Sequence, residues 1–147
     1  MNRSNPTPSG ERIVAPMVEL ARCSTHHRII VAGANSPEHM FELHRRGYAR
    51  VATSANCGLP RGQFDVALVD WQHSIKALET TLDWLVHFLA SAAVLVLRVE
   101  SHDRAGDRKL ASVLEQLGFQ IGAGTRCEHG IAVSARRRDA AQMAIAA

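Results

Sequence analysis

The sequence predicts a doubly wound α/β domain, in which a mostly parallel sheet carries helices on both faces and ends in an antiparallel hairpin. Apolar runs of strand length, 64–70 and 92–99 among them, indicate strands that are buried on both faces. Amphipathic segments with helical spacing separate these runs, and such alternation is typical of parallel sheets. Near the end, residues 119–123 and 131–135 alternate between apolar and less apolar positions, which predicts a hairpin.

The first half of the chain contains two predicted strands and a helix between them. The run 28–32 predicts a buried strand that ends at a glycine. Ser36-Pro37-Glu38 then indicates a helix start, because serine caps free amides, proline suits the first helical position and glutamate faces the positive end of the helix dipole. We therefore expect a helix over 37–46 and a second strand over 48–53. The buried side of this helix is expected to comprise Met40, Phe41 and Leu43.

An amphipathic segment over 13–21 precedes these elements. Its Pro16 argues against a helix before that residue and is compatible with one after it. In the second half, Ser74 is predicted to cap a long helix whose buried stripe includes Leu85 and Leu89. The elements of that half are predicted in the order strand 64–70, helix 74–90, strand 92–99, helix from 103 or 107 to 117, and hairpin.

The 147 residues favour one domain, which we place at 11–138 between flexible tails at 1–10 and 139–147. Lys and Arg number 17 against 14 Asp and Glu, a formal charge of +3. The basic residues are spread along the chain, and with one Tyr, two Trp and four Phe the sequence offers few rings to stack on bases. A nucleic-acid partner is therefore not expected.

The cysteines and the N-terminus indicate a cytoplasmic protein. Three cysteines without CxxC spacing argue against a disulfide framework. The first ten residues lack the apolar core of a signal peptide, and no apolar run reaches the roughly 18 residues of a membrane span. The eight histidines show no pairing with cysteines at zinc-ligand spacing, so no metal site is predicted.

Ligands of doubly wound sheets bind beyond the carboxyl ends of the strands, and the candidate site residues lie there. Asp70 and His73 are candidate catalytic groups, since a carboxylate and an imidazole can serve as general bases. Trp71 is a candidate to stack on a ligand ring. The simpler interpretations stay open: Asp70 caps a loop amide, His73 bonds backbone before the Ser74 cap, and Trp71 packs half-buried.

The stretch Phe-Asp-Val-Ala-Leu-Val-Asp-Trp-Gln-His-Ser at 64–74 resembles the fourth-strand motif of class I S-adenosylmethionine-dependent methyltransferases. The element order over 28–137, with its Leu-Gly-Phe at 117–119 and terminal hairpin, is similar to this Rossmann-like family. The resemblance implies S-adenosylmethionine as cofactor and a small molecule as substrate. The residues it places at the cofactor are Gly33, Ala34, Asn35, Ser54, Asp70 and Trp71. In the catechol O-methyltransferase group an Asp near position 70 binds a divalent metal, and further ligands there would correspond to Glu100 and Asp103. For the turn 33–35, the alternatives are an anion site at free amides and a plain strand-to-helix turn.

The sequence departs from the family pattern at three places. The first family motif has an acid where this chain has Val31, and only Gly33 remains of its glycines. The stretch 52–55 carries no carboxylate to hold the ribose, and Ser54 offers one hydrogen bond instead. The loop 55–63 is too short for the family's third strand and its crossover. We therefore expect weakened or lost cofactor binding, and an exposed second strand whose edge favours a homodimer.

Three function classes follow from these observations. The first is a methyltransferase acting on a small molecule. The second is a non-catalytic module that uses the same fold to bind another protein or another ligand, and the missing acids favour it. The third is a receiver-like signalling domain, because 64–70 resembles a phospho-acceptor strand. The absence of an acidic pair in 33–36 argues against the third class.

Overall fold

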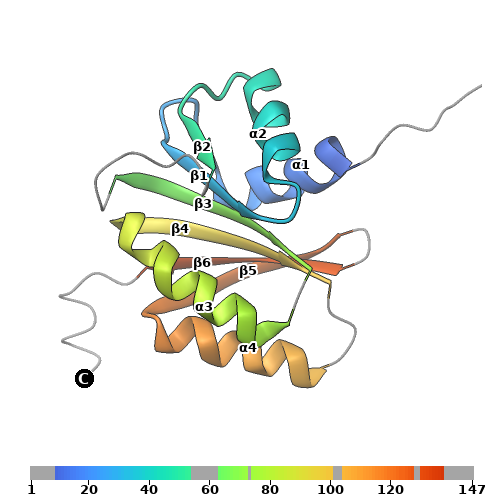
Figure 1. Cartoon of the computed structure of the whole chain (residues 1–147), viewed down its shortest axis with the longest axis vertical. Helices are drawn as coiled ribbons and strands as arrows, with labels where there is room; N and C mark the ends of the chain where they lie inside the picture. Colours follow the sequence, from blue (N-terminus) through green and yellow to red (C-terminus); the bar gives the residue numbers. More distant parts are fainter. Residues whose placement is uncertain (1–8, 54–62, 73, 101–103, 128–129, 138–147) are drawn as a thin grey trace, which may run out of the picture.

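The computed structural model describes residues 9–53, 63–72, 74–100, 104–127 and 130–137. Over these residues six strands form one sheet in the order β2-β1-β3-β4-β6-β5 (Figure 1). The strands are β1 (Ile29–Gly33), β2 (Val51–Thr53), β3 (Phe64–Trp71), β4 (Leu89–Val99), β5 (Phe119–Cys127) and β6 (Gly130–Arg137). The first four pair in parallel, and β6 pairs antiparallel with both β4 and β5. The predicted mostly parallel sheet with a C-terminal hairpin is confirmed.

Helices cover both faces of this sheet (Figure 1). One face carries α1 (Ser9–Ala21) and α2 (Ser36–Arg45), and the other carries α3 (Ile75–Leu85), a 3-10 turn at Val86–Phe88, and α4 (Arg104–Gln116). No helix in the described ranges is long and apolar enough to cross a membrane.

Each face has its own apolar core because successive strand residues point to opposite sides. On β3, Val66 and Leu68 belong to the core beneath α1 and α2, whereas Ala67 and Val69 belong to the core beneath α3 and α4. This double burial is why the strands have largely apolar runs in the sequence. Consequently a polar side chain within such a run is enclosed by the fold, and its partners have to be found inside the protein.

The first helix begins before Pro16 and runs through it, so the expectation that Pro16 argues against a helix before that residue is wrong. Proline lacks an amide hydrogen and weakens the helix locally. The burial of Ile13, Val14 and Met17 against the sheet offsets this loss.

The prediction of a buried Phe41 is also wrong, because this side chain is 74% exposed. The buried residues of α2 are Ser36, His39, Glu42 and Leu43. Since successive helix residues are separated by about 100°, Phe41 lies about 200° from both His39 and Leu43 and faces solvent. The position of a polar residue on the buried side of the helix was not apparent from the apolar pattern.

Two element boundaries differ from the predicted ones. Leu89 begins β4 instead of ending a helix, because α3 stops at Leu85 and a 3-10 turn follows. The second strand is limited to 51–53, since Tyr48 still bonds through its amide to the carbonyl of Leu43 at the end of α2. Within the described residues β2 is an edge strand, and the homodimer across it stays a prediction.

Cys23, just after α1, gives a testable consequence of this packing. Burial raises the pKa of its thiol from 9.0 to about 11. At pH 8 the thiolate fraction is therefore about one thousandth in the folded state and about one tenth after unfolding. We expect iodoacetamide to modify Cys23 roughly 100-fold more slowly in the native protein than in urea. Peptide mapping by mass spectrometry separates this site from the other two cysteines, and equal native and unfolded rates would contradict the assignment.

Candidate functional site at the carboxyl ends of the strands

The carboxyl ends of β1, β3 and β4 lie side by side, and Asp70 is at their centre. In the register of the sheet Asp70 is opposite Gly33 on β1 and opposite Arg98 on β4. By strand alternation its side chain is on the same face as Val66 and Leu68, beneath α2. Asp70 is only 1% exposed. The carboxylate that the sequence singles out is thus inside the protein.

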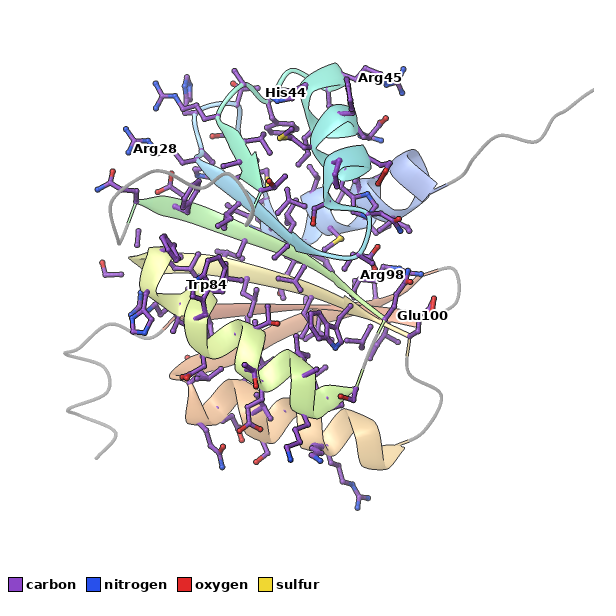
Figure 2. All side chains as sticks on the ribbon, in the orientation of Figure 1. Arg28, His44, Arg45, Trp84, Arg98 and Glu100 are labelled. Atoms are coloured by element: carbon purple, nitrogen blue, oxygen red, sulfur yellow. The ribbon has the colours of Figure 1, made fainter. Side chains whose placement is uncertain are left out.

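Two side chains share this carboxylate. Arg98 donates from Nη1 to Oδ1 of Asp70 at 2.7 Å, and Nε2 of His39 lies 2.9 Å from Oδ2. All three side chains are buried, and we call them the Asp70 cluster. Figure 2 shows Arg98 near the carboxyl end of β4, close to the exposed Glu100. Charge-assisted hydrogen bonds of this kind are short and strong when they are enclosed.

His39 is oriented by Asp70. Because Nε2 faces a carboxylate oxygen, a neutral imidazole carries its hydrogen on Nε2 and presents Nδ1 as an acceptor. Nδ1 is buried and has no hydrogen-bond partner among the residues the structure describes. A carboxylate that orients an imidazole is the arrangement of many general bases. At 3% exposure, however, His39 serves here to hold α2 against β3.

The turn from β1 into α2 is hydrogen-bonded to the end of β3. The amide of Ala34 donates to the carbonyl oxygen of Asp70 at 2.7 Å, and the Ser36 hydroxyl donates to the carbonyl of Gly33 at 2.9 Å. Asn35 adopts a left-handed conformation at the helix N-cap and makes no side-chain cap bond. Of the amides proposed to bind an anion, that of Ala34 is therefore engaged within the fold.

Gly33 has a structural reason to be glycine. Its φ is +91°, and a Cβ atom there would lie 2.1 Å from the carbonyl oxygen of Asp70. No side chain fits that gap without movement of the backbone of β1 or β3. The glycine is thus required by the close approach of the two strands.

The remaining candidate residues are placed as follows. Trp71 is 7% exposed and its indole Nε1 donates to the carbonyl of Ser74 at 2.8 Å, so its ring packs in the core beneath α3. Ser74 caps α3 by accepting from the amide of Ala77 at 3.1 Å, as predicted. His73 and Ser54 lie outside the described residues, as does Asp103. The described ranges contain no group of three or more His, Cys, Asp or Glu side chains able to hold a metal ion.

The sequence interpretation missed Arg98 and His39 as the partners of Asp70. A signal for Arg98 was present, since it is the one charged residue within the apolar run 92–99 and stands near its end, as Asp70 does in its own run. A charge in a buried strand requires a partner, and neighbouring parallel strands bring such positions together. No comparable signal pointed to His39.

The strand ends differ from the cofactor anchors implied by the resemblance. Val31 belongs to the core under α1 and α2, and Thr53 at the end of β2 is buried. Neither supplies a carboxylate for an ammonium group or for ribose hydroxyls. The carboxylate of Asp70, at the end of β3, is held by Arg98 and His39. The described residues therefore do not fit S-adenosylmethionine in the way that the motif of the family holds it.

No protein family matches the sequence, and no curated protein matches it. Solved structures do resemble the fold. A 1,6-didemethyltoxoflavin-N1-methyltransferase of Burkholderia thailandensis, with bound 1,6-didemethyltoxoflavin and S-adenosylhomocysteine, has a TM-score of 0.59 at 16% identity over 88% of this chain and 80% of its own. A ribosomal protein L11 methylase of Lactobacillus delbrueckii subsp. bulgaricus has a TM-score of 0.59 at 11% identity. The likeness covers 91% of this chain and 81% of the methylase chain.

A third similar structure is a protein-(glutamine-N5) methyltransferase, release factor-specific, of Alicyclobacillus acidocaldarius. Its TM-score is 0.54 at 17% identity, over 90% of this chain and 94% of its own. All three likenesses cover nearly the whole described domain. Identities this low establish a shared fold and no more.

Proposed function

Because the chain has the fold of the class I S-adenosylmethionine-dependent methyltransferases, we propose that it is a methyltransferase-like protein with weakened or lost cofactor binding. The observation that carries this proposal is that Asp70 is buried and hydrogen-bonded to other residues of the protein. Its carbonyl accepts from Ala34, and its carboxylate binds Arg98 and His39. The carbonyl and the carboxylate of Asp70 are therefore already engaged by groups of the protein itself.

Magnitudes support a large loss of affinity. One charged hydrogen bond contributes about 1.5–3 kcal/mol, so two missing anchors remove about 3–6 kcal/mol. At about 1.4 kcal/mol per factor of ten, this is roughly two to four powers of ten in Kd. A cofactor held at micromolar affinity by both anchors would be held at about 0.1 mM or more weakly without them.

In this proposal the protein is a binding module whose rim recognises a small molecule or another protein. The similar structures act on both classes by name: a toxoflavin precursor in one, ribosomal protein L11 in another. Methyl transfer to a small molecule is the alternative, and it requires productive cofactor binding. Cofactor affinity is therefore the quantity that separates the two.

Calorimetric titration with S-adenosylhomocysteine tests the proposal. We expect the wild-type protein to show a Kd of about 0.1 mM or weaker, or no measurable heat, since the anchors are missing. The variant Ser54→Glu introduces a carboxylate at the sequence position directly after Thr53, the last residue of β2, and Ser54→Gln is its uncharged control. If the wild-type protein still binds S-adenosylhomocysteine weakly, the Ser54→Glu variant should bind it about 10- to 100-fold more tightly than the Ser54→Gln variant. A wild-type Kd below about 10 µM would overturn the proposal.

A further inference from the structure

A hollow lies at the opposite end of the sheet from Asp70. It has a volume of about 330 Å³ and lies between the end of α1, the first residues of β3 and β4, and the end of β6. Figure 2 shows Arg28, next to this end, far from Arg98 at the carboxyl ends. The amide of Arg28 donates to Asp65 Oδ2 at 2.9 Å, which fixes one of the lining residues. The hollow is therefore separate from the site described above.

An irregularity of β4 forms this hollow. Phe64 pairs with Leu89, but Val66 pairs with Val94, so β4 uses five residue steps where β3 uses two. The extra residues bulge away from β3, and bulges near sheet ends commonly re-aim side chains. Those that line the hollow are small: Ala90, Ser91 and Ala92. Small side chains on a bulged strand leave space that a regular ladder would fill.

Hydrogen-bond donors dominate the polar lining. Arg22 and Arg136 are among the lining residues, and both are exposed at the surface. Within the described part of the chain, no side-chain hydrogen bond or ion pair is seen for either guanidinium group. His27 accepts the amide of Ser24 at Nδ1, so a neutral ring carries its hydrogen on Nε2 and is a donor there. Ser91 adds a hydroxyl.

The formal charge of the lining is positive. Two arginines contribute +2 and Asp65 contributes −1, which leaves +1. One oxygen of Asp65 already accepts from the Arg28 amide. Arg136 is on the same face of β6 as the buried Ala132, and it is opposite Val94 in the ladder. Arg136 therefore shares the lining of the hollow with the apolar residues Val66 and Val94.

The geometry points to a binding site for a small organic oxyanion at this hollow. A carboxylate or phosphate group would be held by Arg22 and Arg136, whose planar donors match both oxyanions. The carbon part would lie against Val66 and Val94, and a hydroxyl would reach Asp65. The volume lies at the lower end of the range of small-molecule sites, which favours a small ligand.

Titration of the full chain with glycerol 3-phosphate and with glycerate tests this inference, and the two arms distinguish a phosphate from a carboxylate ligand. Glycerol, which lacks the charge, is the ligand control. Amide chemical shifts report where each compound binds, at a fixed ionic strength of about 0.15 M because salt screens exposed charges. We expect one of the anions to bind with a Kd below about 1 mM and to shift the amides of Asp65, Ser91 and Val94.

Matched variants separate a built site from general attraction to a basic protein. Arg136→Gln should weaken anion binding at least tenfold, whereas Arg108→Gln on the exposed side of α4 removes the same charge and should leave it unchanged. Ala92→Leu, which fills the hollow without altering charge, should abolish binding while the circular dichroism spectrum is retained. Equal effects of the two arginine variants, shifts confined to the rim around Gly33, or affinities weaker than about 1 mM for both anions would each overturn the inference.

Discussion

Replacing Arg98 with methionine will destabilise the protein by about 3–5 kcal/mol, because it leaves the Asp70 carboxylate buried without its cation. Asp70 is 1% exposed, and Arg98 is the donor to its Oδ1. His39 would remain at Oδ2 as the other partner seen in the fold. Urea unfolding followed by circular dichroism measures the loss of unfolding free energy. A loss below about 1 kcal/mol would show that the pair is solvated in solution.

The double variant Asp70→Leu/Arg98→Met distinguishes two effects: the loss of the attraction between Asp70 and Arg98, and the cost of leaving the Asp70 carboxylate buried without a cation. Removing both charges avoids an unpaired buried ion, so this variant should be more stable than Arg98→Met alone. Arg108→Met applies the same chemical change on the exposed side of α4 and should stay within about 0.5 kcal/mol of the wild type. The pair of comparisons isolates the contribution of the Asp70 cluster.

Gly33→Ala will destabilise the protein by about 2–5 kcal/mol. A left-handed backbone costs about 1–2 kcal/mol for a residue with a Cβ atom, and overpacking adds about 1–3 kcal/mol. Both terms apply, because φ is +91° and the added atom would meet the Asp70 carbonyl oxygen at 2.1 Å. The same urea experiment measures the effect.

Gly47→Ala is the matched control for this substitution. Gly47 has a similar φ of +97°, but the nearest atom to an added Cβ is Cγ2 of Thr25 at 4.0 Å. Gly47→Ala should therefore lower the free energy of unfolding only by the cost of the left-handed backbone, about 1–2 kcal/mol. Equal losses for the two variants would mean that β1 and β3 separate readily at Gly33.

The architecture was predictable because the local signals agree with the long-range packing. The run 64–70 is apolar apart from Asp65 and Asp70, and it forms β3, in which all residues but Asp65 are buried. Ser74 caps α3 through its hydroxyl, as a serine before an amphipathic segment predicts. The alternation at 119–123 and 131–135 corresponds to the antiparallel β5 and β6.

The errors arose where tertiary packing determined the outcome. The helix across Pro16 forms because Val14 and Met17 are buried against the sheet. Phe41 is exposed because the buried side of α2 includes His39, a residue type that apolar periodicity does not count. The end of α3 at Leu85 has no glycine or proline to mark it in the sequence.

The candidate site was only partly predictable. The position of Asp70 at a strand end followed from its run, but its partners are 28 and 31 residues away in the sequence. Arg98 meets it through the register of β3 and β4, and His39 through the rotation of α2 about its axis. Neither the register nor the rotation can be read from residue spacing alone.

The bond between Asp70 and Arg98 also constrains how the protein is made. A ribosome completes β1, α2 and β3 before it adds the residue that neutralises the Asp70 carboxylate. Until then His39 is the partner of this carboxylate that the chain has already supplied, and burying the carboxylate fully without Arg98 would be unfavourable. The Asp70 cluster is therefore completed only after β4 has emerged and paired with β3.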